Sequence, residues 1–402
     1  MFDVCIIGGG TAGISAARTA SAFDLKTVMF EKSLLGGVCL NHGCVPSKIY
    51  LQSLKNGDNS PEKIYEKFDK IRNSFQQKIK ADLNLSGVKT VESEAEILPK
   101  RGDLFAVKSG ESVIESKFLI IASGSVPKNE GIFFPKTQDE IPENIDIVGG
   151  AIAGFEAAQI FNALGSKVRV LEKSDGFCVN LSQNAVNILV NKMQKNGIEF
   201  VKNFDGEIRS NAYFANGRKF AAIKGSENLS LEICENSILS DEYCRTSVEN
   251  CFAIGDINSK SMLAHTATQE GICAINKIMG NDLPLDYESV PSVLYTDPSI
   301  VRVGVLPNGG EKYELRKMPL SGNAKFRATT DNGERGLCEA VIEKESQRIV
   351  GLHLISPGAE ELSAAMSLIV GQKMTVNGLR RSVFAHPTIS EIITETVFYG
   401  RI

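Results

Sequence analysis

The chain has little of what several classes of protein require. No apolar run in its 402 residues reaches the roughly 18 residues that a membrane-spanning helix needs. No long basic run accompanies the formal charge of −4, so neither nucleic acid nor a membrane is expected as the main partner. The absence of tryptophan excludes no class of protein. The length predicts two or three domains.

No signal peptide precedes the first predicted strand, Phe2–Ile7, so we expect a cytoplasmic protein. Cytosolic proteins keep most thiols reduced, and a cysteine pair there is more often catalytic, redox-active or metal-binding than structural. Metal binding is disfavoured here, because the chain has only four histidines and its closest cysteine pair lacks C-x-x-C spacing.

That pair lies in residues 36–48, which read Gly-Gly-Val-Cys-Leu-Asn-His-Gly-Cys-Val-Pro-Ser-Lys. Cys39 and Cys44 are too far apart on a regular helix for a disulfide. A bridge needs a distorted first turn, for which Gly43 and Pro46 are suited. A helix that begins just after Cys44 would bring its positive end to the sulfurs and favour a thiolate. The segment predicts a redox dithiol rather than a structural disulfide.

The other seven of the nine cysteines are expected to act as small buried hydrophobic residues. A free cysteine is among the most buried residue types, so this expectation follows from the residue type alone. The seven are Cys5, Cys178, Cys234, Cys244, Cys251, Cys273 and Cys338.

One unit of strand, glycine turn, helix and strand occurs twice. The two copies are related by one constant offset, which brings Gly8, Gly13 and Glu31 onto Gly149, Gly154 and Glu172. In each copy the acid therefore stands at the same distance beyond the last glycine. This pattern is the fingerprint of a dinucleotide-binding unit, in the strand–turn–helix context that supports it.

The residue types of the first copy suit a bound dinucleotide. Gly8 permits the tight turn, Gly10 lets the backbone approach a pyrophosphate, and Gly13 lets the helix pack closely on the strand. The helix that begins near Thr11 offers unpaired N–H groups and a positive dipole end to the phosphates. Glu31 would accept hydrogen bonds from the adenosine ribose hydroxyls.

The second copy carries Ala151 in place of the middle glycine, and its methyl group crowds a pyrophosphate without excluding it. Glu172 favours NAD over NADP, because a carboxylate would repel a 2′-phosphate. Arg169 and Lys173 could soften this preference, although strand alternation points Arg169 elsewhere. We therefore expect NAD at this site.

Several stretches, in this order along the chain, resemble the class I pyridine nucleotide–disulfide oxidoreductases, and most closely their dihydrolipoamide dehydrogenase branch. Each short stretch is unspecific by itself, but their order together with the redox segment is specific. The stretches are Gly36–Lys48, Ile121–Ser125, Ala253–Asp256, Leu263–Ala267, Tyr295–Pro298 and His386–Glu391.

The resemblance implies an α/β fold with two Rossmann-like dinucleotide-binding domains, the second shortened and inserted in the first, and a C-terminal α+β dimerisation domain. The expected boundaries are 1–138 and 251–285 for the FAD-binding domain, 139–250 for the NAD-binding domain and 286–402 for the interface domain. In the last domain, Leu337–Glu343 and Arg348–Ile355 read as hairpin strands and Glu360–Gln372 as a helix. The family's interface domain forms a dimer, so a homodimer is expected.

The resemblance also implies roles for single residues. Cys39 would be the interchange thiol that meets the substrate, and Cys44 the flavin-side thiol that makes a charge-transfer contact. Lys48 would lie near the reactive edge of the flavin with Glu156 as its ion partner; the alternative is a solvated helix residue. Asp256 would bind the ribityl–phosphate part of FAD, and it could also cap the following helix.

His386 is the candidate acid–base, and Glu391 would fix its tautomer and strengthen its basicity. In the family this pair reaches the disulfide of the other subunit. The alternative for Glu391 is a capping box with Thr388. Of the other histidines, His42 is expected to pack or hydrogen-bond, His265 to lie along the flavin, and His353 to belong to a strand.

Two sets of cofactor contacts complete the prediction. The FAD set consists of Gly8, Gly10, Gly13, Glu31, Lys32, Gly37, Val38, Lys48, Ala95, Ser123, Gly124, Asp256 and Ala264. The NAD set consists of Gly149, Ala151, Gly154, Glu156 and Glu172.

The implied reaction passes electrons between a dithiol and NAD. One substrate sulfur attacks Cys39 while His386 takes a proton, and the second sulfur then displaces Cys39. Cys44 passes the electrons to the flavin, which reduces NAD⁺. Leu40-Asn41 and Val45–Lys48 resemble the lipoamide branch, so lipoamide or a lipoylated carrier protein is the expected substrate. No extra C-terminal cysteine pair is present, which argues against a mercuric reductase.

The chain departs from the family mainly in its second nucleotide domain. The stretch from Gly154 to Gly255 is short, strands are expected to be missing around Phe204–Ala222, and the family's A-x-G-R-x-P-N stretch is reduced to Ala222–Asn228 without its arginine and proline. The interface domain is abbreviated near Pro307–Lys317. Reduction of another small disulfide, a thiol relay without NAD, and a non-catalytic scaffold are therefore retained as alternatives.

Overall fold

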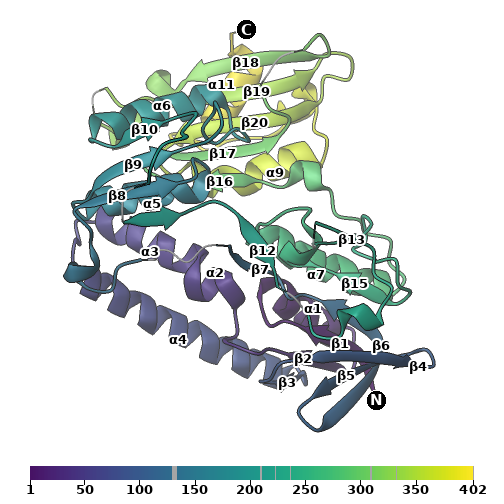
Figure 1. Cartoon of the computed structure of the whole chain (residues 1–402). Helices are drawn as coiled ribbons and strands as arrows, with labels where there is room; N and C mark the ends of the chain where they lie inside the picture. Colours follow the sequence, from purple (N-terminus) through teal and green to yellow (C-terminus); the bar gives the residue numbers. More distant parts are fainter. Residues whose placement is uncertain are drawn as a thin grey trace. The chain divides into compact units, whose positions relative to one another are not determined.

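The computed structural model of the chain describes residues 1–128, 134–208, 211–221, 223–235, 237–307, 310–331 and 333–401. Its internal contacts divide the chain into two compact units, whose elements are labelled in Figure 1. The first unit comprises residues 1–49, 62–130 and 217–285, and the second comprises 50–61, 131–216 and 286–402. Among the described residues, no helix is long and apolar enough to cross a membrane.

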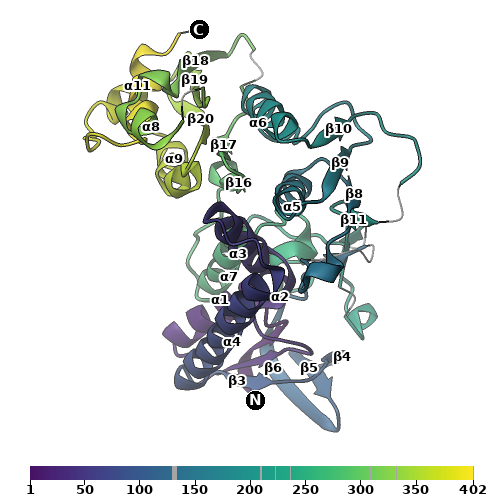
Figure 2. The same cartoon turned by 90° about the vertical axis from the view of Figure 1, so that its left-hand side faces the viewer.

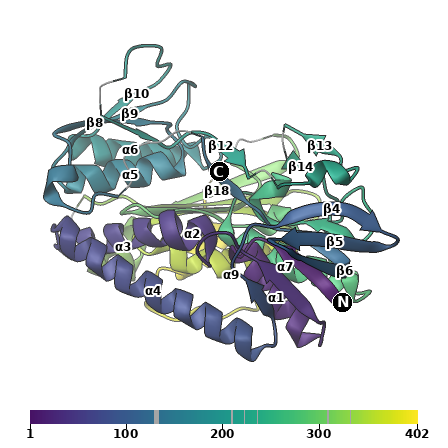
Figure 3. The same cartoon turned by 60° about the horizontal axis from the view of Figure 1, so that its bottom comes forward.

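A seven-stranded sheet forms the centre of the first unit. Its strands follow the order β3-β2-β1-β6-β5-β4, and β15 also pairs with β6. The order is parallel around β1 and antiparallel through β4, β5 and β6, which lie side by side in Figure 3. The strands are β1 (Phe2–Ile7), β2 (Thr27–Phe30), β3 (Lys89–Val91), β4 (Glu96–Arg101), β5 (Leu104–Ser109), β6 (Ser112–Ile121) and β15 (Cys251–Ala253).

Strand β1 is buried on both faces, as its continuous apolar run requires in a parallel sheet. Val4 and Ile6 face one core cluster, whereas Cys5 and Ile7 face another. The first cluster contains the alanines of α1 and α7, whose small side chains let these two helices pack closely. The helices of this unit are α1 (Thr11–Ala22), α2 (Gly37–His42), α4 (Pro61–Leu85) and α7 (Ala264–Ile278), with the start of α3 (Cys44–Lys55).

Two small strand pairs lie beside this sheet in the same unit. They are β7 (Ser125–Pro127) with β12 (Arg218–Phe220), and β13 (Ile233–Cys234) with β14 (Ser237–Ile238). Both pairs contact the Gly255–Asn258 turn, η3, the first through the hydrogen bond of Ser125 with Asp256 and the second through β14.

The second unit contains a parallel sheet, β10-β9-β8-β11, and an antiparallel sheet, β16-β17-β20-β19-β18. One core cluster joins them, because Leu294, Ile300 and Ile355 of the antiparallel sheet pack with Ile147 and Phe161 of the parallel layer. The strands are β8 (Asn144–Val148), β9 (Lys167–Leu171), β10 (Glu199–Val201), β11 (Ala212–Phe214), β16 (Ser292–Leu294), β17 (Ser299–Gly304), β18 (Tyr313–Pro319), β19 (Leu337–Glu343) and β20 (Ile349–Ser356).

Helices cover the antiparallel sheet in Figure 2, where α8, α9 and α11 gather against it. The predicted hairpin and helix of this region are confirmed, with β19 at the predicted bounds and the helix divided into a short turn, η6 (Ala359–Leu362), and α9. The helices of the unit are α5 (Ile152–Ala163), α6 (Gln183–Lys195), α8 (Ala324–Thr329), α9 (Ser363–Gly371), α10 (Val376–Leu379) and α11 (Glu391–Tyr399).

The duplication predicted from the sequence is confirmed in the strand order. β10, β9, β8 and β11 follow one another as β3, β2, β1 and β6 do. The amide of Ala215 donates to Val148 O just as that of Ala122 donates to Ile7 O. The second copy lacks the β4–β5 meander before its fourth strand among the described residues, which accounts for its shortness.

The stretch that was expected to lack strands, 204–222, contains β11 and β12. Residues 209–210 and 222 of it lie outside the described part. After β11 the chain returns to the first unit, because β12 pairs with β7 and Asn228 Nδ2 donates to Ile97 O at 2.8 Å. Residues 217–250 therefore pack with the first unit, a division that differs from the proposed three-domain boundaries.

Candidate active site

The two cysteines of the redox segment lie on consecutive helices. Cys39 belongs to α2, which ends at Gly43 with φ −130° and ψ −101°, and Cys44 is the first residue of α3. The distortion expected near Gly43 is therefore present, as a break between two helices. Pro46 is the third residue of α3, where the missing N–H costs no intrahelical bond.

The side chains of Cys39 and Cys44 are hydrogen-bonded to each other. This bond and burial raise the pKa of the Cys39 thiol, and the charge of Lys48 opposes the rise. Cys44 is exposed at the N-terminal end of α3, where the helix dipole favours an anionic sulfur. The end of the helix thus favours a thiolate at Cys44, the sulfur expected to face the flavin.

The side-chain amide of Asn41 holds α2, the helix that carries Cys39, in place. Asn41 is buried, and its Nδ2 donates to Gly37 O at 2.8 Å and to Leu35 O at 3.2 Å. Gln76 on α4 completes the arrangement by donating to Asn41 Oδ1 at 2.7 Å. Asn41 was noted only for its resemblance to the lipoamide branch, and no spacing in the sequence relates it to Gln76.

The redox helix begins directly against the first glycine turn. A Cβ atom on Gly37 would lie 2.9 Å from Gly10 Cα, whereas the nearest atom to a Cβ on Gly10 would be 3.9 Å away. Two backbones therefore meet without side chains between them, and the space before Gly10 stays open. This opening, at the N-terminal end of α1, fits the pyrophosphate of a dinucleotide.

Glu31 and Glu172 directly follow strands β2 and β9, and they accept matching hydrogen bonds. Glu31 accepts hydrogen bonds from the amides of Gly9, at 2.7 Å, and Ser33, at 2.8 Å. Glu172 accepts them from Gly150, at 2.8 Å, and Ser174, at 2.9 Å. The constant offset between the two copies thus holds for hydrogen bonds as well as for residue types.

The second acid is ionised at neutral pH. Burial acts to raise the pKa of Glu172, but the amides of Ser174 and Gly150 outweigh it, so the pKa is lowered. Arg169 forms a bidentate ion pair with the buried Asp146, at 2.9 and 2.7 Å. The expectation that Arg169 points away from the nucleotide edge is therefore confirmed.

The last glycine of each motif is required by packing. A Cβ on Gly13 would lie 1.9 Å from Gly8 O, and one on Gly154 would lie 1.9 Å from Gly149 O. We expect Gly13→Ala to lose most of its folded protein, because no backbone movement within the turn can open this contact without moving α1 off β1. Gly10→Ala is the matched control, since its methyl group meets open space. Circular dichroism and thermal unfolding of the two variants check this, and equal stability of both would contradict it.

Asp256 lies at a polar cluster that the sequence showed only in part. Ser125 Oγ donates to Asp256 Oδ2 at 2.5 Å, and Arg218 on β12 places its Nε 2.6 Å from Ser125 Oγ and 3.5 Å from the carboxylate. Arg218 was missed, because the strand that carries it was expected to be absent. Arg218 places a positive charge beside Asp256. The arginine of the family's A-x-G-R-x-P-N stretch is missing from residues 222–228 of this chain.

The remaining predicted FAD contacts lie on the same unit. Lys32 pairs with Glu94 at 3.2 Å, and Ser123 Oγ donates to Ala221 O at 3.2 Å. Gly124 has φ +69° with open space around it. Val38 lies in α2, Ala95 is buried beside β4, and Ala264 begins α7. In the second unit Glu156 is buried and accepts from Tyr295 N at 3.2 Å, so its pairing with Lys48 stays a prediction.

His386 and Glu391 form a hydrogen-bonded pair. His386 Nδ1 lies 2.9 Å from Glu391 Oε1, while Thr388 N–H donates to Glu391 Oε2 at 2.8 Å. The Thr388 amide and His386 lower the pKa of Glu391. Only one half of the predicted capping box forms, because α11 begins at Glu391 and Thr388 Oγ1 contacts Ser390. One carboxylate thus serves both the backbone and the imidazole.

The other histidines have different settings. His353 lies in β20 as predicted, where burial lowers its pKa to about 4 and Nε2 contacts Val305 O at 2.8 Å. His42 is exposed rather than packed, and His265 is exposed on α7. Cys234 is exposed too, so the expectation that all seven remaining cysteines are buried is wrong at this residue, which sits in the small β13–β14 pair.

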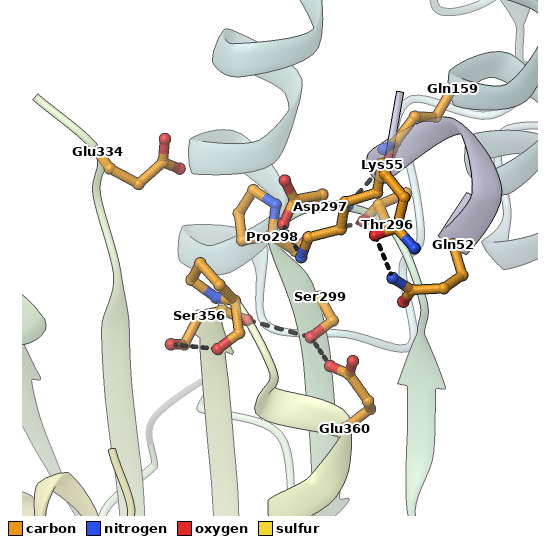
Figure 4. A network of polar contacts seen from close by, with 12 residues as sticks. Gln52, Lys55, Gln159, Thr296, Asp297, Pro298, Ser299, Glu334, Ser356 and Glu360 are labelled. Carbon is orange, nitrogen blue, oxygen red and sulfur yellow. Dashed lines mark hydrogen bonds and ion pairs between the residues drawn. The ribbon is translucent and has the colours of Figure 1, made fainter. Parts of the chain in front are cut away.

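The Tyr295–Pro298 stretch is fixed by a network within the second unit (Figure 4). Asp297 accepts from Lys55 Nζ at 3.1 Å, and its amide donates to Gln159 Oε1 at 3.0 Å. Ser299 follows; its hydroxyl donates to the Glu360 carboxylate, and its Oγ lies 3.1 Å from Ser356 O. Asp297 therefore joins the stretch to α3 and α5, and Ser299, the first residue of β17, joins the next strand to β20.

Known proteins match the chain over nearly its whole length. Residues 2–271 match the family described as pyridine nucleotide-disulphide oxidoreductase, and residues 290–397 match its dimerisation domain. The dihydrolipoyl dehydrogenase of Chlamydia trachomatis is 30% identical over 454 residues, covering 98% of this chain and 96% of that protein. The mitochondrial dihydrolipoyl dehydrogenase of Canis lupus familiaris is 28% identical over 465 residues, covering 98% and 89%. These alignments exceed 402 residues, so the relatives contain segments that this chain lacks.

Solved structures show the same fold. LpdA of Mycobacterium tuberculosis superposes with a TM-score of 0.90 at 22% identity, covering 99% of both chains. The HOCl-induced flavoprotein disulfide reductase RclA of Escherichia coli superposes with a TM-score of 0.86 at 20% identity, covering 99% of this chain and 100% of that one. The predicted α/β fold and the predicted resemblance are both confirmed. The chain belongs to the pyridine nucleotide-disulphide oxidoreductase family, and it is a flavoprotein disulfide oxidoreductase of a family that uses FAD and NAD.

Proposed function

We propose that this enzyme oxidises dihydrolipoamide, carried on a protein, and passes the electrons through its dithiol and FAD to NAD. The observation that carries the proposal is the junction of Gly37 with Gly10, which starts the helix of Cys39 against the open pyrophosphate site. Gly10 and Gly37 would therefore hold the pyrophosphate of a dinucleotide beside the start of the helix that carries Cys39. FAD, when bound, supplies a two-electron acceptor that can reduce a nicotinamide.

The residues of this chain account for the thiol chemistry. In the disulfide form, a substrate thiolate attacks Cys39 Sγ, and the S–S bond breaks to leave Cys44 as a thiolate. The second substrate thiolate then attacks the substrate sulfur of this mixed disulfide, which closes the substrate disulfide and releases Cys39. His386 takes the proton of the first attacking thiol, the proton of the second passes to the departing Cys39 sulfur, and Glu391 holds the Nδ1 side of His386.

The dimer and the location are parts of the same proposal. The dimerisation domain at 290–397 supports a homodimer, in which His386 of one chain would serve the dithiol of the other. A cytoplasmic location is consistent with a dithiol that must be kept reducible. The proposal also includes the FAD contacts, the NAD contacts and the three domains expected from the sequence.

The choice of NAD rests on the second motif. The ionised Glu172 ends β9 at the nucleotide edge, and Arg169, the nearby cation, is held by Asp146. A 2′-phosphate would therefore meet a carboxylate without a compensating arginine. The short second domain, which starts α5 with Ala151 as its N-cap, supports the alternative of a thiol relay that does not use NAD.

An anaerobic visible spectrum tests the proposal. We expect a yellow protein whose flavin band is bleached by one equivalent of NADH and by one equivalent of dihydrolipoamide, and at least about ten times more slowly by NADPH because of the carboxylate. A flavin that responds to dihydrolipoamide but not to NADH would favour the relay. A flavin that responds to NADH alone would favour another disulfide, and colourless protein would favour a scaffold.

A further inference from the structure

The side chain of Glu339 is buried, and the proposed reaction does not use it. Glu339 lies on β19 and is 1% exposed. Its two carboxylate oxygens accept from the start of α6, where Ser182 Oγ donates to Oε2 and Asn184 Nδ2 donates to Oε1 at 2.7 Å. β19 belongs to the segment that matches the dimerisation domain, whereas α6 belongs to the proposed NAD-binding domain. The side chain of Glu339 therefore joins these two domains within the second unit.

The other polar groups around Glu339 compensate it less directly. Lys317, on the neighbouring strand β18, has its Nζ 3.8 Å from Glu339 Oε1. His353 pairs with Glu339 across β20 and β19, but burial lowers the pKa of His353 to about 4, so its imidazole is neutral at pH 7. A buried carboxylate without hydrogen-bond donors would be costly. Ser182 and Asn184 are therefore the partners that Glu339 holds most tightly.

Ser182 is the residue at which α6 begins. It is the N-cap of the helix, and its Oγ accepts from Ala185 N at 3.4 Å while it donates to Glu339. The hydroxyl thus satisfies one N–H group at the start of the helix and is itself oriented by the carboxylate. Ala185 and Leu189 of α6 share a core cluster with Ile355 of β20, so packing holds the helix against the dimerisation domain as well.

Residues 173–182, which we call the nucleotide loop, connect the acid after β9 with the N-cap of α6. At the start of the loop, Ser174 N–H donates to Glu172 Oε1 at 2.9 Å. In its middle, Cys178 N–H donates to Gly150 O at 2.9 Å. The loop therefore contacts both the acid and the glycine turn that the proposed function assigns to NAD.

The first copy of the motif holds the corresponding loop in a different way. There Gly36 N–H donates to Gly9 O at 2.8 Å, which is the counterpart of the bond from Cys178. The residue after it, Gly37, lies with its bare backbone against the turn. In the second copy the residue after Cys178 is Val179, which carries a side chain at the matching position. The second loop therefore lacks the glycine of the first, and its far end is held by the carboxylate on β19.

We propose that Glu339 is a positioning residue for NAD, through which the dimerisation domain sets the conformation of the nucleotide loop. This role rests on the proposed function, because it takes the second glycine motif as the NAD site. Glu339 holds Ser182, Ser182 ends the loop, and the loop holds Glu172 at the place where the adenosine ribose binds. Loss of this anchor loosens the loop and weakens the binding of NAD, whereas electron transfer from the dithiol to the flavin does not depend on it.

Glu339→Gln tests this role in the full-length flavoprotein. Glutamine has the same shape, but only one of its two terminal atoms can accept a hydrogen bond. We expect the NADH concentration that gives half the maximal rate of flavin reduction to rise about ten-fold, the effect of losing one hydrogen bond to a carboxylate. The maximal rate, and the reduction of the flavin by dihydrolipoamide, should not change. Ser182→Ala removes the same bond from the other side, so it should give a similar rise, and the double variant should add little to it.

Glu334→Gln is the matched control. Glu334 also joins α6 to the dimerisation domain, through an ion pair with Lys192 at 3.0 Å. Lys192 stands almost three helical turns after Ser182, a rise of about 15 Å, so this link lies away from the nucleotide loop. The response of Glu334→Gln to NADH should match that of the wild type. An equal rise in Glu334→Gln and Glu339→Gln would mean that both residues only stabilise the fold, and would overturn the proposal.

Hydrogen exchange, measured without NADH, separates this role from the proposed function. The amides of Ser174, Cys178 and Leu181 are hydrogen-bonded within or beside the loop. In Glu339→Gln we expect the peptide 173–182 to exchange about ten times faster than in the wild type, and the peptide 33–37 of the first copy to exchange at the same rate. Unchanged exchange at 173–182 would overturn the proposal even if NADH reduces the flavin. If NADH does not reduce the wild-type flavin, the proposed function is wrong, and the exchange rates alone decide whether Glu339 holds the loop.

Discussion

Replacing Cys44 with serine is expected to lower kcat for a dithiol substrate by roughly 10³-fold or more, because a hydroxyl cannot form or break the protein disulfide. The geometry supports an effect of this size. Cys44 begins α3, and its thiol is hydrogen-bonded to the thiol of Cys39. The variant keeps the glycine turn and its close approach to Gly37, and should therefore keep its flavin.

Steady-state oxidation of dihydrolipoamide, with flavin content measured on the same samples, checks this result. Cys234→Ser is the matched control, since it removes an exposed thiol from the same unit without touching the pair. The control should retain wild-type activity. A Cys44→Ser enzyme that kept more than a tenth of the wild-type kcat would mean that the thiols do not carry the electrons.

The second large effect is expected at His386, where glutamine should lower kcat by about 10²–10⁴-fold, the usual contribution of a general acid–base group. The imidazole is 73% exposed in the single chain and its Nδ1 is held by Glu391, so Nε2 remains the side that can reach a thiol. The loss should be largest where proton removal from the substrate limits the rate, and should diminish at high pH, where the substrate ionises by itself.

Glu391→Gln isolates the positioning part of this effect. The pKa of Glu391 is lowered by the Thr388 amide and by His386, so the carboxylate is charged in the folded protein above its usual pKa of about 4.5. The contribution of the Glu391 carboxylate to the stability of the folded state is complete above that pH. It is lost as the pH falls through the lowered pKa of the folded state. Glutamine should therefore lower kcat across the neutral range and shift the acid limb of the pH–rate profile.

The pH–rate profiles of both variants are the deciding measurement. Glu395→Gln, on the same helix α11, is the control for an altered charge at this end of the chain. A normal profile for Glu391→Gln would assign that carboxylate to the Thr388 amide alone. Full activity of His386→Gln would remove the histidine from the reaction.

The sequence predicted best those features that local chemistry determines. Glycines at turns, the acid at the end of each strand and the break at Gly43 follow from backbone geometry, and each is present. Arg169 was placed correctly because alternation along a strand is local. The sequence left the role of Glu391 ambiguous, since the same residues can cap a helix or orient a histidine. In the folded chain, Oε1 of Glu391 contacts His386 and Oε2 accepts from the Thr388 amide.

Contacts between distant segments were not predictable from one chain. Arg218 reaches Asp256 because the short strand β12 pairs with β7, and a strand that short carries almost no periodic signal. Asn41 and Gln76 meet because α4 runs beside α2. Cys244 and Cys273 were assigned to the core by residue type, and both are buried.

The contact of Gly37 with Gly10 has a consequence for inheritance and engineering. Because two backbones touch there, a side chain larger than hydrogen at Gly37 would push the redox helix from the nucleotide turn. The 36–48 segment therefore cannot be transferred by itself to another dinucleotide-binding protein. The recipient would need a glycine in its turn at the position that matches Gly10. The two segments, which α1 and β2 separate along this chain, are expected to be exchanged between proteins only as one piece.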